Sequence, residues 1–71
     1  MLNAAALRAK MADRSCSAKD FSESLGLSKS AFYRRLSGKS FFTVPEVLLC
    51  EKLLGLTSDE RDRIFFADEV A

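Results

Sequence analysis

Residues 18–39 constrain the fold more than any other part of the chain, because they predict two short helices joined by a tight turn. Phe21 and Leu25 lie four residues apart, the spacing of one helical face. Gly26 follows at the position where a left-handed residue ends many helices, and glycine adopts that conformation without a steric clash. A second helix, with a polar and basic outer face, begins after Ser28. The segment therefore predicts a rigid pair of helices that presents one charged helical face to solvent.

Residues that cap helices support this pair of helices and predict three more. Asn3, Ser17, Ser28 and Thr43 each precede a segment with apolar residues at helical spacing, and their side chains can accept N–H groups of the first turn. Ser17 with Asp20 resembles a capping box, and Thr57 with Glu60 matches one. The expected helices span residues 3–13, 18–25, 29–36, 44–54 and 58–68.

The composition supports one small core built from these helices. The chain has 71 residues, 48% of them hydrophobic, which predicts a single domain over residues 1–71. No segment alternates apolar and polar residues as a strand would, so the expected fold class is all-α, a compact five-helix domain. The chain shows neither a long apolar segment nor a signal-peptide pattern, and we expect it to be cytoplasmic, with no membrane partner.

The residue types predict no enzyme and no cofactor. Histidine is absent, and Cys16 and Cys50 do not form a metal-binding pair. Both cysteines are expected to be small buried residues. Asp59, Glu60 and Asp62 are explained by the start of a helix, where carboxylates favour the helix dipole. No metal and no small-molecule ligand is predicted.

The two halves of the chain differ in charge. Residues 1–39 hold eight basic and three acidic side chains, a net charge of +5, whereas residues 40–71 hold three basic and seven acidic ones, a net charge of −4. The overall net charge of +1 therefore conceals a polarised molecule. The basic half suits a polyanion, and the acidic half is expected to face away from it.

The chain resembles the helix-turn-helix domains of the phage repressor and Cro type, the XRE-like family. The resemblance rests on the Gly26-Leu27-Ser28 turn, on SKSAFYRRLSGK, and on FTVPEV followed by LLGLT. It implies a lambda-repressor-like fold with the helix-turn-helix formed by the second and third helices. Two departures stand out: many members have Gln where this chain has Ala18, and an apolar or small residue is commoner than Glu51.

The resemblance implies that the helix of residues 29–36 lies in the major groove of double-stranded DNA. The outward residues that match the base-reading face are Ser28, Lys29, Ser30, Tyr33 and Arg34. Arg34 can bind the O6 and N7 atoms of guanine as a fork. Tyr33 either touches a thymine methyl and a phosphate or packs against the preceding helix, and the sequence leaves both open.

Contacts to DNA phosphates are expected from helix N-termini and from the loop after the third helix. The predicted phosphate-contacting residues are Ser17, Ala18, Lys19, Arg35, Lys39 and Ser40. For Arg35 the alternative is an ion pair with a nearby acid such as Glu23.

A homodimer, at least on DNA, is expected because one such domain reads only a few base pairs. The apolar residues predicted at the interface are Leu49, Leu53, Phe65 and Phe66. The alternative is that all of them belong to the core.

The expected function is a sequence-specific transcriptional regulator, a phage or prophage repressor or Cro-like protein that occupies a palindromic operator. The alternative is a protein-interaction module that kept the fold without operator binding. Acids or large apolar residues on the outer face of the third helix would mark such a module, whereas Lys29 and Arg34 stand there.

Overall fold

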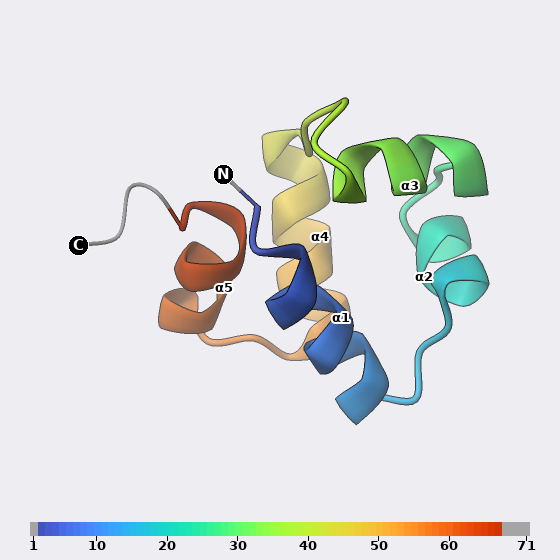
Figure 1. The fold of residues 1–71 in the computed structure, drawn as a ribbon. Helices are drawn as coiled ribbons and strands as arrows, with labels where there is room; N and C mark the ends of the chain where they lie inside the picture. The colour runs from blue at the N-terminus through green and yellow to red at the C-terminus, as the bar shows by residue number, and fades with distance from the viewer. Residues whose placement is uncertain (1, 68–71) are drawn as a thin grey trace.

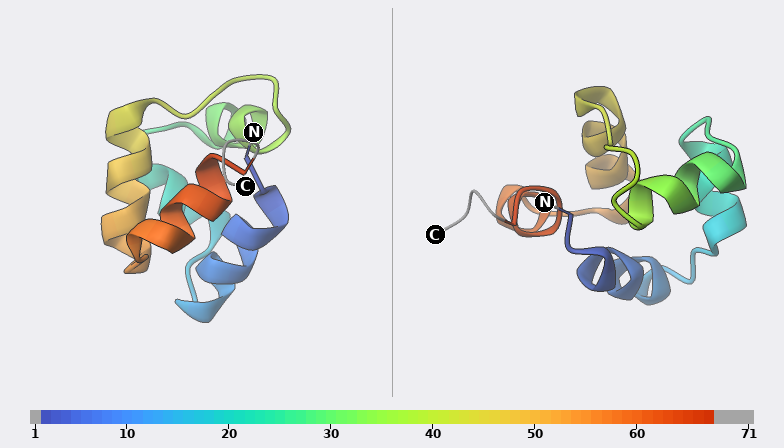
Figure 2. Two further views of the ribbon diagram at one scale, coloured as in Figure 1. Left: turned by 90° about the vertical axis from the view of Figure 1, so that its left-hand side faces the viewer. Right: turned by 45° about the horizontal axis from the view of Figure 1, so that its top comes forward.

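The computed structural model describes residues 2–67, and within this range the chain forms five α-helices and no strand (Figure 1). They are α1 (Ala4–Asp13), α2 (Ala18–Ser24), α3 (Lys29–Leu36), α4 (Val44–Leu54) and α5 (Ser58–Phe65). Helices α2 and α3 form one end of the molecule, α5 forms the other, and α1 and α4 lie between them (Figures 1 and 2). The predicted all-α, five-helix class is confirmed. The fifth helix ends at Phe65, earlier than expected, and the predicted end at residue 68 lies outside the described residues.

The side chain before each helix accepts a first-turn N–H, as the sequence predicted for all five. The acceptors are Asn3, Ser17, Ser28, Thr43 and Thr57. At Thr57 the expected capping box with Glu60 forms. A second box, between Thr43 and Glu46, was missed in the sequence although its spacing is the same. At Ser17 only the Ser17 half forms, because the Asp20 side chain is one methylene shorter than glutamate.

Four phenylalanine rings run in a row through the core and join the two ends of the molecule. Phe21 of α2 contacts Phe32 of α3 edge to face, with ring centroids 5.7 Å apart. Phe32 then meets Phe42 of the α3–α4 loop at 6.3 Å, and Phe42 meets Phe65 of α5 at 5.4 Å. Phe32 is 0% exposed. The row fixes the inner side of α3 against α2 directly and connects it to α5 through Phe42, by aromatic contacts that add to simple burial.

The turn between α2 and α3 has the geometry that its glycine predicts. Gly26 adopts a φ of +73°. The Leu27 N–H donates to the Ser22 carbonyl at 2.9 Å and the Gly26 N–H donates to the Glu23 carbonyl at 3.0 Å, which together form a Schellman motif. This motif turns the chain sharply, so that α3 begins directly after α2 and packs on it.

Candidate nucleic-acid interface

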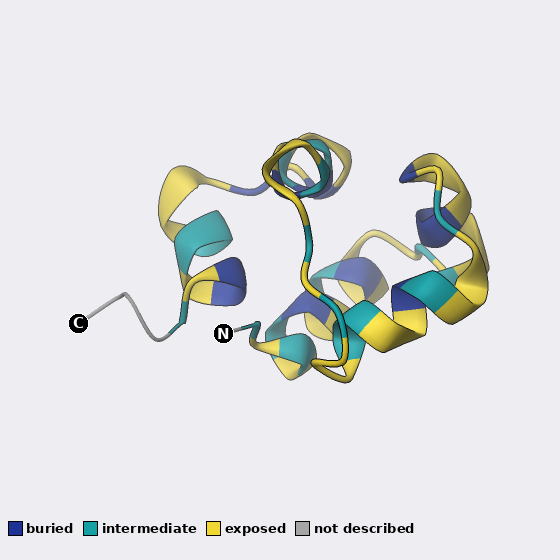
Figure 3. Ribbon diagram, turned by 90° about the horizontal axis from the view of Figure 1, so that it is seen from above, coloured by how far each residue is buried: buried dark blue, intermediate teal, exposed yellow. Residues whose placement is uncertain are grey.

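The inner and outer sides of α3 differ completely in burial. Phe32 is fully buried and its neighbours Ala31 and Leu36 are half-buried. The five predicted base-reading residues Ser28, Lys29, Ser30, Tyr33 and Arg34 are all exposed. The view from above shows this exposed side along α3 (Figure 3). Ser30, Tyr33 and Arg34 line one surface of the helix, Lys29 precedes them in the first turn, and Ser28 caps the helix by accepting the Ala31 N–H. We call this exposed side of the helix the α3 outer face.

Tyr33 is both packed and accessible. Its ring lies 6.0 Å from the Phe32 ring, tilted by 51°, and 45% of the residue remains exposed. The contact with Phe32 holds the ring at the edge of the core. The ring packing observed is with Phe32 of α3 itself and not with the preceding helix, and the exposed part of the ring still offers a surface to a partner. A contact between Tyr33 and DNA stays a prediction.

Arg34 and Arg35 are neighbours in α3 with opposite environments. Arg34 is exposed and makes no ion pair within residues 2–67. Arg35 is half-buried and forms a two-pronged pair with Glu46 of α4, with its Nε 3.0 Å from Oε1 and its Nη2 3.3 Å from Oε2. The partner of Arg35 is therefore Glu46 and not Glu23. The ion pair that was the alternative for Arg35 is thus present, and its phosphate contact stays a prediction.

The predicted phosphate site at the backbone N–H groups of the turn after α3 is wrong. The backbone N–H groups of Lys39 and Ser40 both donate to the Arg34 carbonyl, at 3.0 and 3.2 Å. They close the end of α3 and are not free to bind an anion. The Lys39 side chain is exposed, whereas Ser40 is half-buried. The Lys39 ammonium group and the Ser40 hydroxyl, not the backbone, are thus the groups left for a phosphate here.

The predicted contacts at the start of α2 occupy its first turn. Ser17 and Lys19 are exposed and Ala18 is half-buried against the core. Ser17 accepts the Asp20 N–H as an N-cap. The N–H groups of the first turn lack partners within the helix. These contacts stay predictions.

A shallow hollow of about 520 Å³ runs along the α3 outer face and is closed on one side by α1. We call it the α1–α3 hollow. Its lining residues are Arg8, Ser30, Tyr33, Arg34, Leu36, Ser37 and Lys39. Arg8 was missed in the sequence, because nothing in the spacing of α1 indicates which of its exposed residues lies beside α3.

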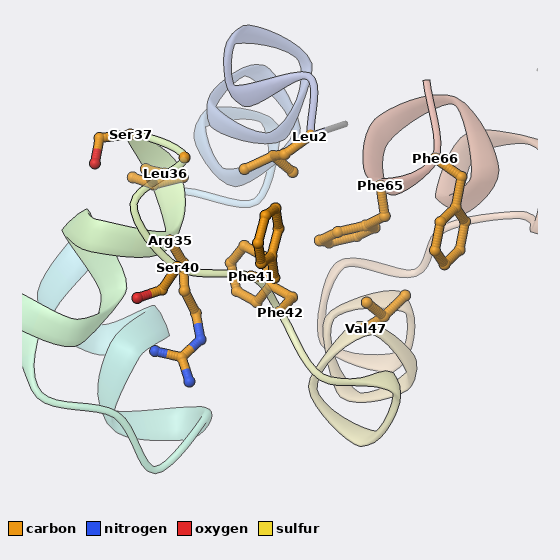
Figure 4. Close-up of a pocket in the computed structure, with 11 residues that line it drawn as sticks. Leu2, Arg35, Leu36, Ser37, Ser40, Phe41, Phe42, Val47, Phe65 and Phe66 are labelled. Atoms are coloured by element: carbon orange, nitrogen blue, oxygen red, sulfur yellow. The ribbon is translucent and has the colours of Figure 1, made fainter. Parts of the chain in front are cut away.

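A second, apolar hollow of about 650 Å³ lies between the α3–α4 loop and the end of α5 (Figure 4). The Phe41, Phe42, Phe65 and Phe66 rings line it together with Leu2, and Phe41 is 84% exposed. Phe65 is only 7% exposed and belongs to the core, so its assignment to a dimer interface is corrected. Phe66, at 39% exposed, remains accessible because the chain leaves the helix after Phe65.

Carboxylates of the acidic half are held in ion pairs. Arg61 lies 3.2 Å from Glu51 and 3.0 Å from Asp62, and Lys10 pairs with Glu60. Glu51, which departs from the family pattern, therefore joins α4 to α5. Lys10 and the Thr57 N–H hold the pKa of Glu60 at about 2, below its usual 4.5.

The residues predicted at a dimer interface do not form one patch. Glu46 marks the flank of α4 that meets α3, and Glu51 marks the flank that meets α5. With about 100° between successive helical residues, Leu49 and Leu53 lie on the Glu46 flank. Phe66 follows α5, on the other side. Leu53 is exposed and Leu49 is half-buried against the core.

The remaining features bear on other kinds of function. Burial raises the pKa of the Cys50 thiol to about 12 and also raises that of Cys16, so neither is an activated nucleophile. In the described part of the chain, no group of three metal-ligating side chains is brought together, and no helix has the length and apolarity to cross a membrane. No family model, curated protein or solved structure matches the chain.

Proposed function

We propose that this protein binds double-stranded DNA sequence-specifically by placing α3 in the major groove. It would act in the cytoplasm as a phage or prophage repressor or Cro-like regulator that occupies an operator and blocks polymerase. The observation that carries the proposal is the α3 outer face, where Lys29, Ser30, Tyr33 and Arg34 are all exposed on a helix anchored from behind by Phe32. A major groove about 12 Å wide admits one such helix.

The residues of this face offer complementary chemistry to base edges. The Arg34 guanidinium can donate two parallel hydrogen bonds to guanine, which contributes about 1–3 kcal/mol of discrimination against other bases. Lys29 supplies a point charge for a guanine or a phosphate. Ser30 donates or accepts, and the Tyr33 ring can contact a thymine methyl. No acidic residue stands on this part of α3, so nothing there repels DNA.

Rigidity of α3 supports the proposal as much as its charge does. The Arg35–Glu46 pair ties α3 to α4, and the Phe21 and Phe32 rings tie it to α2. A base-reading side chain must arrive at a base edge with an error of less than about 1 Å, because hydrogen bonds weaken steeply with distance and angle. A helix fixed on two sides meets this requirement.

A homodimer on DNA is part of the proposal. Two copies with half-sites about 34 Å apart would read a palindromic operator. Accessible apolar side chains are present for such contacts, among them Leu53, Phe41 and Phe66. Light scattering at concentrations up to several hundred micromolar, without and with a palindromic duplex, tests this step. The dimer is ruled out if the mass is that of one chain without DNA and that of one chain plus one duplex with the palindromic DNA, at every concentration.

The decisive experiment is selection of bound fragments from random duplex DNA, followed by binding measurements with variants. Arg34→Ala is expected to weaken binding about 5- to 150-fold and to relax one position of the consensus. Lys29→Ala is expected to weaken binding with little change in consensus. Lys52→Ala, an exposed lysine of α4 outside the face, is the matched control. Unchanged binding by both face variants would rule out the groove assignment.

A protein-interaction module is the second candidate, and the apolar hollow favours it. Phe41, 84% exposed, and Phe66, 39% exposed, both line it, and a cluster of exposed apolar side chains beside an apolar hollow suits a protein partner. A failure to enrich any DNA sequence, together with loss of a cellular binding partner in Phe41→Ser but not in Arg34→Ala, would favour this function over operator binding.

A further inference from the structure

The α1–α3 hollow combines side chains from three segments. Ser30, Tyr33, Arg34 and Ser37 follow the i, i+3, i+4, i+7 spacing of one helical face and form its floor. Lys39 closes it from the turn after α3, and Arg8 closes it from α1. The hollow is therefore continuous with the α3 outer face, and extends it toward the C-terminal end of α3.

The position of Arg8 is set by the core. Leu7 is fully buried and Met11, one turn later, is buried beside it, which fixes the rotation of α1. Asn3 further holds the start of α1, because its N–H donates to the Ile64 carbonyl at 2.7 Å. Arg8 is exposed on the side that faces α3. The placement of its charge beside α3 thus follows from packing.

The charges of the hollow are all positive. Arg8, Arg34 and Lys39 line it, and none of them is in an ion pair with another described residue. No acidic residue stands three or four positions from Arg8 or Arg34, the separations at which a helix would supply a partner. Three like charges in one depression repel each other, and an anion would relieve that repulsion. The hydroxyls of Ser30 and Tyr33 can donate to the same anion, whereas that of Ser37 donates to the Arg34 carbonyl at 3.1 Å.

We propose that the α1–α3 hollow binds a phosphate of the DNA backbone, with Arg8 and Lys39 as its main ligands. The inference rests on the proposed function, and it assigns to α1 a part in DNA binding. With α3 in the groove, Arg34 is directed at base edges, whereas Arg8 and Lys39 lie beyond it, where the sugar-phosphate strand borders the groove. A contact there positions α3 along the groove without reading sequence.

Salt dependence measures this contact directly. Binding to the selected duplex is followed between 50 and 300 mM NaCl for the unaltered chain, Arg8→Gln and Lys52→Gln. Each phosphate neutralised contributes about −0.9 to the slope of log K against log[salt]. Because Lys39 shares the phosphate, Arg8→Gln alone is expected to make the slope less negative by part of this amount. Arg8→Gln combined with Lys39→Gln is expected to give the full change of about 0.9 and to weaken binding roughly eightfold near 0.1 M salt. Lys52→Gln should leave both unchanged.

Two further readouts separate a phosphate contact from other roles of Arg8. The consensus of Arg8→Gln should match that of the unaltered chain, and affinity should fall equally on operator and random duplexes. Thermal unfolding without DNA should show Arg8→Gln as stable as the unaltered chain or slightly more so, because one repelling charge is gone. An altered consensus, or a loss of folding that accounts for the weaker binding, would overturn the inference.

The outcomes also distinguish this inference from the proposed function. If the unaltered chain binds no duplex at all, the proposed function and the phosphate site are both wrong. If Arg34→Ala weakens DNA binding but Arg8→Gln leaves the salt slope unchanged, only the phosphate site is wrong. Lys39→Gln provides a second variant. Arg8→Gln and Lys39→Gln together should change the slope by no more than about 0.9, the contribution of one phosphate.

Discussion

The α2–α3 end and the α4–α5 end of the molecule are built by the same devices but treat charge in opposite ways. In both, a hydroxyl side chain caps the helix that follows a turn whose glycine has a positive φ. At the α4–α5 end, Glu51 and Glu60 are held by basic partners. On the α3 outer face, Lys29 and Arg34 have no ion pair within the described residues. The α3 outer face therefore carries basic charge with no acid beside it, which is the property that the proposed function requires.

The largest expected effect contrasts the two sides of α3. Phe32→Ala removes a ring that is 0% exposed and touches Phe21 and Phe42, and it should lower the free energy of unfolding by about 3–5 kcal/mol. Tyr33→Ala, one residue later and half-exposed, should cost about 1 kcal/mol or less. Urea unfolding followed by circular dichroism measures both. Equal losses would mean that the outer face is as much part of the core as the inner side.

The second prediction sets Arg35 against Arg34. Arg35→Ala leaves Glu46 half-buried without its partner and should destabilise the fold by about 2–3 kcal/mol. Arg34→Ala should change stability by no more than about 0.5 kcal/mol. On DNA the order should reverse, at temperatures where both variants are folded. If Arg35→Ala binds DNA more weakly than Arg34→Ala at equal folded fractions, Arg35 contacts DNA directly.

Local rules were enough to predict the helices and the core from the sequence. The caps, the glycine after α2 and the spacing of Phe21, Leu25 and Phe32 act over a few residues, and the structure follows them. The exposed α3 outer face follows from the same spacing. What the sequence predicted well is thus what one helix and its ends determine.

The errors concern contacts between elements distant in the sequence. Glu46 was not predicted as the partner of Arg35, because an acid on α2 matches just as well until the position of α4 is known. Phe65 was not separated from Phe66, because the choice depends on where α5 ends. Arg8 was missed for the same kind of reason. The candidate site gains its boundaries from tertiary packing, and spacing within one helix cannot give them.

The third prediction compares the turns of the two ends. Gly26 and Gly55 both have positive φ, +73° and +63°. An added Cβ at Gly26 meets no atom within 4 Å, so Gly26→Ala should cost only the backbone strain, about 1–2 kcal/mol. At Gly55 the added Cβ meets the guanidinium of Arg14, which must also move. Gly55→Ala should therefore cost slightly more, and combining it with Arg14→Ala should remove the excess in thermal unfolding.

The smallest expected effect comes from the Lys10–Glu60 pair, because the two side chains are 35% and 34% exposed and water screens them. The Lys10 ammonium and the Thr57 N–H lower the pKa of Glu60 from 4.5 to about 2. The stability that this carboxylate contributes is complete above pH 4.5 and is lost as the pH falls through about 2. Unfolding temperatures between pH 6 and pH 2 should therefore decline less in Glu60→Gln than in the unaltered chain. Lys10→Gln keeps the Thr57 bond and should fall between them. Identical pH profiles for all three proteins would show that the pair contributes nothing to the stability of the α4–α5 end. The contrast with the α3 outer face, where Lys29 and Arg34 have no ion pair within the described residues, would then rest on Glu51 and its partner Arg61 alone.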